Sequence, residues 1–185
     1  MRSILRTTLS TVAMLMALGL AAHAQQAPSV IADLRADIEE AEKKLLDLAR
    51  AIPAEKYSWR PAPGVRSIGE VVVHVAADNY LIPAALGTPA DASTGIKGDD
   101  YNTVLAYEKR TMNKAAAIAE LEKSFAFLKK SLSETPATRL GESVTVFGSS
   151  MTPQKVWILA TTHVHEHLGQ LIAYARSNGV KPPWS

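Results

Sequence analysis

Two histidines near the C-terminal end of the chain, His163 and His167, are four positions apart. In a helix this spacing places both on one face with their Cβ atoms roughly 6 Å apart, so that two ring nitrogens can bind one ion. The same face carries apolar residues that should point into the core: Val156, Ala160, Leu171 and Tyr174. Because a buried imidazole needs a polar partner, this placement favours a metal site.

A third histidine, His74, lies on another apolar segment, where it shares a helical face with Val71, Val75 and Asp78. A single buried histidine is usually hydrogen-bonded to a backbone carbonyl, and this alternative stays open for His74. One shared ion, however, satisfies three inward-facing imidazoles more easily than three separate partners do. The three rings therefore predict an open transition-metal site, in which water or substrate fills the remaining position.

Such an ion activates water or a thiol as a nucleophile near neutral pH, or polarises a carbonyl group. We expect a divalent zinc or nickel ion, with iron, manganese and copper as alternatives, because imidazole binds all of these metals. Asp78, one turn after His74, is the candidate catalytic group, as a general base, a fourth ligand or an orienting carboxylate. A solvated or capping role is the alternative for Asp78, and His165 and Glu166 should point to the surface.

Four amphipathic helices are predicted to position these side chains, because apolar residues recur in them at steps of three and four. They cover about 29–50, 67–83, 111–133 and 152–178. Ser67 and Glu70 form a capping-box pattern at the second helix, and Thr152-Pro153 is typical of the start of the fourth. A short helix is expected at 101–110, a short strand or an extended crossover arm at 144–147, and a mobile surface loop at 87–100. This pattern predicts an all-α bundle.

The first residues have the features of a secretory signal peptide. Arg2 and Arg6 precede a mostly apolar run, and Ala22-His23-Ala24 matches the small-x-small cleavage pattern. The alternative is a membrane anchor, but the apolar run is shorter than the roughly 20 residues of a membrane span. We therefore expect residues 1–24 to be removed, residues 25–185 to form one domain, and the mature protein to be periplasmic or secreted, without a membrane span.

Charge and cysteine content narrow the function classes further. The chain has 20 basic and 18 acidic residues, and loss of Arg2 and Arg6 with the signal peptide would balance them. A near-neutral chain lacks the basic surface typical of nucleic-acid binding. The sequence contains no cysteine, which excludes disulfides, thiolate metal ligands and a cysteine nucleophile.

Two segments resemble the DinB-like superfamily of the DinB/YfiT type. Residues 57–75, which begin Tyr57-Ser58-Trp59-Arg60-Pro61, are similar to the family's approach to its second helix, and residues 163–183 to its last helix and tail. The resemblance implies a four-helix bundle with an up-down-down-up arrangement and a long crossover between the second and third helices. It also implies a divalent metal on three histidines, which correspond to His74, His163 and His167, and a possible homodimer.

Characterised members of this family include thiol S-transferases that use bacillithiol, mycothiol or glutathione, and a mycothiol-dependent maleylpyruvate isomerase. An exported member would be separated from such thiols, which are chiefly cytoplasmic. The sequence therefore predicts a metal-dependent transferase or hydrolase that acts on a small molecule. The alternatives are a non-catalytic metal-binding or stress-related interaction module, and a purely structural bundle with satisfied core histidines.

Overall fold

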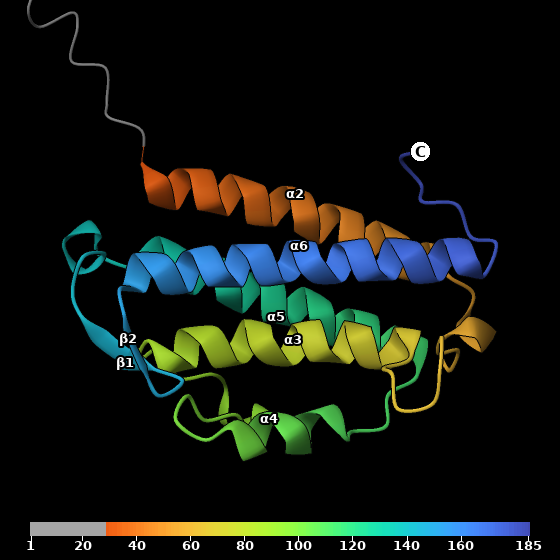
Figure 1. Cartoon of the computed structure of the whole chain (residues 1–185), viewed down its shortest axis with the longest axis horizontal. Coiled ribbons are helices and arrows are strands. Elements are labelled where there is room, and N and C mark those ends of the chain that lie inside the picture. The colour runs from red at the N-terminus through yellow and green to blue at the C-terminus, as the bar shows by residue number, and fades with distance from the viewer. Residues whose placement is uncertain (1–28) are drawn as a thin grey trace, which may run out of the picture. The chain divides into compact units, whose positions relative to one another are not determined.

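Four long helices dominate the computed structural model of the chain, which describes residues 29–185 (Figure 1). They are α2 (Val30–Ala51), α3 (Ile68–Ala85), α5 (Lys114–Glu134) and α6 (Pro153–Ser177). A shorter helix, α4 (Tyr101–Glu108), packs against α3. The predicted signal peptide lies outside the described residues and stays a prediction, while residues 31–185 make up a single unit.

The four long helices have the expected up-down-down-up order. In Figure 1, α2 and α6 run from left to right, whereas α3 and α5 both run from right to left. Two consecutive parallel helices need a long connection, and residues 86–113 supply it with a 3-10 turn (Ala92–Thr94) and α4. The predicted all-α four-helix bundle is therefore confirmed.

Local capping explains where the helices begin and end. Ser67 and Glu70 form the predicted capping box of α3, and the Thr152 side chain caps α6. α5 begins three residues later than expected, because the side chain of Asn113 accepts a hydrogen bond from the backbone N–H of Ala116. α3 continues two residues past Pro83, whose carbonyl accepts hydrogen bonds from the residues that follow the helix.

Of the two alternatives for 144–147, the short strand is the one that forms: β1 (Val144–Val146) pairs with β2 (Ser149–Met151) in a small antiparallel hairpin. Phe147 and Gly148 form its two-residue turn, both with positive φ, which matches the twist of paired strands. β2 was not predicted, because Ser149 and Ser150 have no apolar alternation. The hairpin lies beside the C-terminal end of α3 and the N-terminal half of α6 (Figure 1).

α3 is the central helix of the core. It is buried on nearly all sides and packs against α5, α6 and α4. A helix that is apolar all round belongs in the interior, and His74 therefore lies in the most buried part of the bundle. None of the helices within residues 29–185 is long and apolar enough to cross a membrane.

Candidate metal centre

The structure brings the three predicted histidines together. The Nε2 atom of His163 lies 3.3 Å from Nε2 of His74 and 3.0 Å from Nε2 of His167. His74 and His167 are buried and His163 is nearly so. Each ring offers a nitrogen within 4.8 Å of the other two, so the three can hold a metal ion. One rigid helix sets the His163–His167 spacing, and the packing of α3 on α6 adds His74.

The outer nitrogens of two rings are already used. Nδ1 of His74 donates to Oε1 of Glu108 at 2.6 Å, because an ionised carboxylate can only accept. Nδ1 of His167 donates to Oε1 of Gln170 at 2.7 Å, and the amide of Gln170 donates in turn to the hydroxyl of Tyr174. In a neutral imidazole with Nδ1 protonated, Nε2 carries a lone pair. The Nε2 lone pairs of His74 and His167 therefore point into the same small space, and a cation bound there would stabilise this arrangement.

The separations of the nitrogens fit a bound transition metal. With metal–nitrogen bonds of 2.0–2.1 Å, two ligands at a tetrahedral angle lie about 3.3 Å apart, and two at a right angle about 2.9 Å. The observed His74–His163 distance of 3.3 Å and His163–His167 distance of 3.0 Å are close to these two values. Each of these two pairs of nitrogens can therefore bind one ion, and the distances do not select a particular metal.

The charge states also suit metal binding. Burial is the main reason that the pKa of His167 is lowered to about 4; the neighbouring His163 and His74 contribute to the lowering, and the hydrogen bond to Gln170 opposes it. The ring is therefore neutral at pH 7, as a metal ligand must be. Burial alone would raise the pKa of Glu108, but hydrogen bonds from His74 and Arg66 outweigh it and hold that pKa below its usual value.

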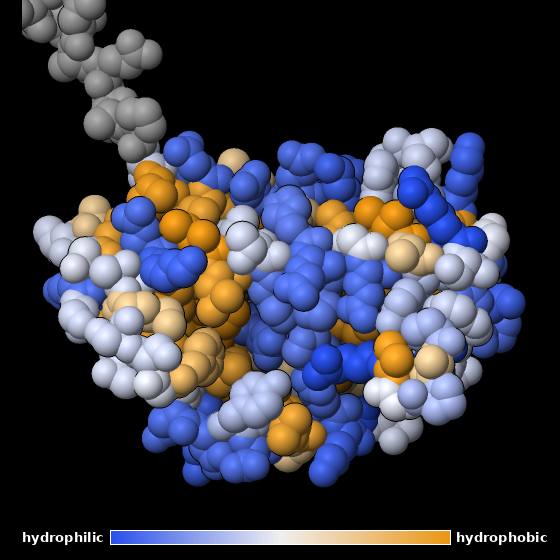
Figure 2. Space-filling view, viewed as in Figure 1, coloured by the Kyte–Doolittle hydropathy of each residue, from blue (hydrophilic) through white to orange (hydrophobic). Residues whose placement is uncertain are grey.

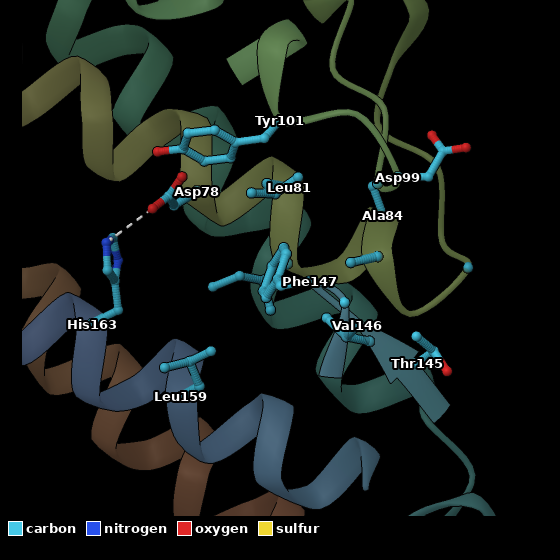
Figure 3. Close-up of a pocket in the computed structure, with 15 residues that line it drawn as sticks. Asp78, Leu81, Ala84, Asp99, Tyr101, Thr145, Val146, Phe147, Leu159 and His163 are labelled. Atoms are coloured by element: carbon cyan, nitrogen blue, oxygen red, sulfur yellow. Dashed lines mark ion pairs between the residues drawn. The ribbon is translucent and has the colours of Figure 1, made fainter. Parts of the chain in front are cut away.

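Asp78 lies beside two of the three rings. Its Oδ2 is 3.0 Å from Nε2 of His163, as Figure 3 shows, and 3.6 Å from Nε2 of His74. Its other oxygen, Oδ1, is buried and has no hydrogen-bond partner among the described residues. A carboxylate in this position can accept a proton or bind an ion. His165 and Glu166 are exposed, as predicted.

Two hydrogen-bond partners of the histidines, the carboxylate of Glu108 and the amide of Gln170, were not predicted from the sequence. Glu108 lies at the end of α4, 34 positions after His74, and Arg66 holds its other oxygen at 3.0 Å. Carboxylates that orient a ligating histidine in this way are common around metal sites. Gln170 could have been found, because it follows His167 by three positions on the same helical face, whereas only the packing of α4 on α3 reveals Glu108.

A pocket of about 840 Å³ opens from the site toward the hairpin. Asp78 and His163 lie at one end of it, and Figure 3 shows the hydroxyl of Tyr101 pointing toward Asp78. The wall farther from the histidines is mainly apolar, formed by Leu81, Ile82, Val146, Phe147 and Leu159. In Figure 2, hydrophobic residues gather on the side where Figure 1 places the hairpin. Tyr101 is a further residue of the site that was not predicted from its position in the sequence.

Comparison with solved structures gives the same fold. A DinB-like protein from Bacillus cereus ATCC 10987 has a TM-score of 0.63 at 19% identity, covering 77% of this chain and 89% of its own. A conserved protein from Enterococcus faecalis has a TM-score of 0.67 at 17% identity, with 81% and 97% covered. YfiT from Bacillus subtilis, described as a probable metal-dependent hydrolase with an unusual four-helix bundle topology, has a TM-score of 0.61 at 14% identity, with 85% and 93% covered.

A comparison with curated proteins finds no match to this chain. The family model of the DinB superfamily, in contrast, matches residues 37–171. That range includes α3, α4, α5, the hairpin and the part of α6 that carries both histidines. The resemblance seen in the two sequence segments is thereby confirmed, and the chain belongs to the DinB superfamily.

Proposed function

We propose that the protein is a metal-dependent enzyme of the hydrolase type, in which His74, His163 and His167 hold a divalent transition metal. One observation carries this proposal: three imidazole nitrogens lie within 4.8 Å of one another, with Nε2 of His163 3.3 Å and 3.0 Å from those of His74 and His167, and two of the outer nitrogens are already used as donors. The description of YfiT as a probable metal-dependent hydrolase supports the same reaction class.

A divalent ion in such a site supplies a Lewis acid that polarises a carbonyl and activates water or a thiol. The surrounding residues would do the rest. Asp78 would accept a proton from the nucleophile, because its Oδ2 faces His163 and His74 and its Oδ1 has no competing partner within residues 29–185. Glu108 and Gln170 would hold two rings in the tautomer that presents Nε2. The apolar pocket wall would exclude water from the far side of the substrate.

Metal content tests the first half of the proposal. Protein purified without a histidine tag should contain a stoichiometric transition metal by elemental analysis. Substitution of His74, His163 or His167 by Ala should weaken metal affinity by at least about 100-fold, more than the loss of an outer partner does. His165→Ala is the matched control, because this exposed histidine lies on the same helix. A metal-free native protein, or equal losses in all four variants, would reject the site.

Turnover measurements test whether the metal-loaded protein is a hydrolase with Asp78 as its general base. The metal-loaded protein should hydrolyse activated esters, and Asp78→Asn should lower kcat about 100-fold or more while metal content stays unchanged. Asp99→Asn is the control, since Asp99 lines the same pocket away from the histidines. If Asp78→Asn lost the metal as well, Asp78 would be a ligand, and if it kept full activity the general-base role would be wrong.

We also propose that the enzyme works outside the cytoplasm after cleavage behind Ala24. This rests on the signal-peptide pattern of residues 1–24. N-terminal sequencing of the protein from an exporting host should find Gln25 as the first residue. An intact Met1 in the exported fraction, or retention in the cytoplasm, would contradict the proposal.

A further inference from the structure

We infer that the pocket beside the histidines binds an uncharged substrate with an apolar tail, such as an ester or amide of a medium-chain or aromatic acid. The inference rests on the proposed function, since the metal would hold the polar head of this substrate. It goes further by fixing the chemistry of the rest of the molecule from the lining of the pocket (Figure 3).

Exposed hydrophobic side chains are concentrated around this pocket. Among residues 29–185, five large hydrophobic side chains are exposed: Tyr101, Leu105, Phe147, Leu159 and Trp184. Three of them, Tyr101, Phe147 and Leu159, line the pocket although they come from α4, the hairpin turn and α6. A contiguous apolar surface left open to water is typical of a binding site, and its volume of about 840 Å³ is in the range of small-molecule pockets.

The backbone at the hairpin turn supports the same interpretation. Phe147 has φ 53°, a conformation that a bulky residue rarely adopts, and the residue is 48% exposed. Asn or Gly would fit this turn without strain. The fold thus tolerates a strained, water-exposed phenylalanine at the one place where its ring lines the pocket, which favours a role in holding an apolar ligand.

The charges of the residues that line the pocket indicate that the tail of the substrate is uncharged. The carboxylates of Asp78 and Asp99 line the pocket, and its lining includes no lysine or arginine. Away from the proposed metal, an anionic tail would meet the carboxylate of Asp99 and no cationic side chain of the lining, whereas an uncharged tail meets no such repulsion. Because His163 and Asp78 lie at one end and Phe147 and Val146 farther along (Figure 3), the polar head should sit at the histidines and the tail should extend toward the hairpin.

Three hydroxamates that share one metal-binding head test this inference in calorimetric titrations of the metal-loaded protein. Octanohydroxamic acid has an uncharged tail, acetohydroxamic acid has almost none, and suberic acid monohydroxamate has the octanoyl length with a terminal carboxylate. Each buried methylene strengthens binding about fourfold, so we expect the octanoyl compound to bind at least about 100-fold tighter than the acetyl compound. The compound with the terminal carboxylate should bind at least about 10-fold more weakly than the octanoyl compound, and Asp99→Asn should restore part of this lost affinity.

Matched leucine variants locate the tail. Leu159→Ser should weaken octanohydroxamate binding about fivefold or more without changing acetohydroxamate binding, metal content or sedimentation. Leu105→Ser is the control, because Leu105 is 41% exposed, close to the 38% of Leu159, but does not line the pocket. Equal binding of the long and short hydroxamates, or no effect of Leu159→Ser, would overturn the inference. A dimer that dissociates in Leu159→Ser would do so too, because a second copy would then cover the wall.

The same titrations separate this inference from the proposed function. If the protein binds no metal, acetohydroxamate will not bind at all, and the proposed function fails. In that case 1-octanol, titrated against octanoate, tests the pocket alone: preference for the alcohol supports the inference, and equal or reversed affinity overturns it. If acetohydroxamate binds to the metal but the octanoyl tail adds nothing, the metal site stands and the inference about the tail fails.

Discussion

Two pockets of nearly equal size lie in the described part of the chain. The one described above, of about 840 Å³, opens at Asp78 and His163, and the other, of about 890 Å³, lies between the loop before α3 and the end of α4. The second pocket is lined by many more charged residues, including Arg60, Arg66, Arg110 and Lys114. Volume and charge alone would therefore point to the second pocket as the binding site.

The hydrogen bonds of the polar side chains in the two pockets favour the first pocket instead. In the second pocket Arg60 binds Glu70 and the carbonyl of Val65, and Arg110 binds two loop carbonyls. Lys114 likewise donates to two carbonyls at the end of α2. These cations already stabilise the loops that surround them, whereas Oδ1 of Asp78 and Nδ1 of His163 have no partner among the described residues. Unused polar groups, rather than pocket size or net charge, distinguish a reactive site from a structural cleft.

The largest expected effect is metal removal. If the ion is present at 100 times its Kd, it stabilises the fold by about 2.7 kcal/mol, so a chelator should lower Tm by about 5–10 °C. Differential scanning calorimetry with and without chelator measures this shift. The Tm of His163→Ala should not respond to chelator. An unchanged Tm for the native protein would mean that no stabilising metal binds beside the first pocket, and the two pockets would then not differ in this respect.

Gly98→Ala tests the wall of the first pocket. A Cβ at this position would overlap the backbone of Ala84 and Ala85, which cannot move like a side chain. Overpacking of this kind costs about 1–3 kcal/mol, measurable by urea denaturation. Gly141→Ala is the control, because a Cβ there meets nothing within 4 Å. Equal stability of the two variants would show that the 87–100 loop is free to move, as the sequence alone suggested, rather than tightly packed at Gly98.

Glu108→Gln tests the residue of the second pocket that also hydrogen-bonds the candidate metal ligand His74. The charge of Glu108 supports the His74 ring, so its loss should weaken metal affinity about 10-fold, the lower end for an outer partner. Glu70→Gln provides a matched carboxylate in the second pocket without contact to a histidine. Competition with a chromophoric chelator measures both affinities. A comparable loss in Glu70→Gln would mean that general electrostatics, not the bond to His74, supports the metal.

Ser67→Ala tests the structural role of the second pocket. The Ser67 hydroxyl accepts a hydrogen bond from the backbone N–H of Glu70 at the start of α3. Loss of such a cap destabilises a protein by about 1 kcal/mol, which chemical denaturation can resolve. Metal affinity should stay unchanged, and a drop in affinity would show that the two regions are coupled.

The smallest effect concerns the pH dependence of the same cap. The hydrogen bond from the Ser67 backbone N–H, helped by Arg60 against partial burial, lowers the pKa of Glu70 below its ordinary value of 4.5. A carboxyl whose pKa is lower in the folded state stabilises the fold above that ordinary value, and this contribution disappears as pH falls through the lowered pKa. Glu70→Gln should therefore be less stable than the native protein at pH 7 and equally stable at pH 3. A gap that persists at pH 3 would assign the effect to packing.

The helices and the three histidines were accessible from the sequence because both depend on local spacing. Apolar steps of three and four located α2, α3, α5 and α6, and the four-residue step placed His163 and His167 on one face. Asp78 was found in the same way, one turn after His74. The hairpin turn at Phe147 and the place of Tyr101 in the pocket lining were not predicted, because a short polar strand and a single tyrosine have no periodic signal.

The sequence by itself determined which side chains face the core, because helical geometry fixes that within each segment. Tertiary structure alone decided that Glu108 reaches Nδ1 of His74, that Asp78 faces His163, and that Tyr101, Phe147 and Leu159 line one pocket. These contacts join residues tens of positions apart, and their distances depend on how helices and loops pack. Side-chain packing acts through space, so no spacing along the chain can encode it.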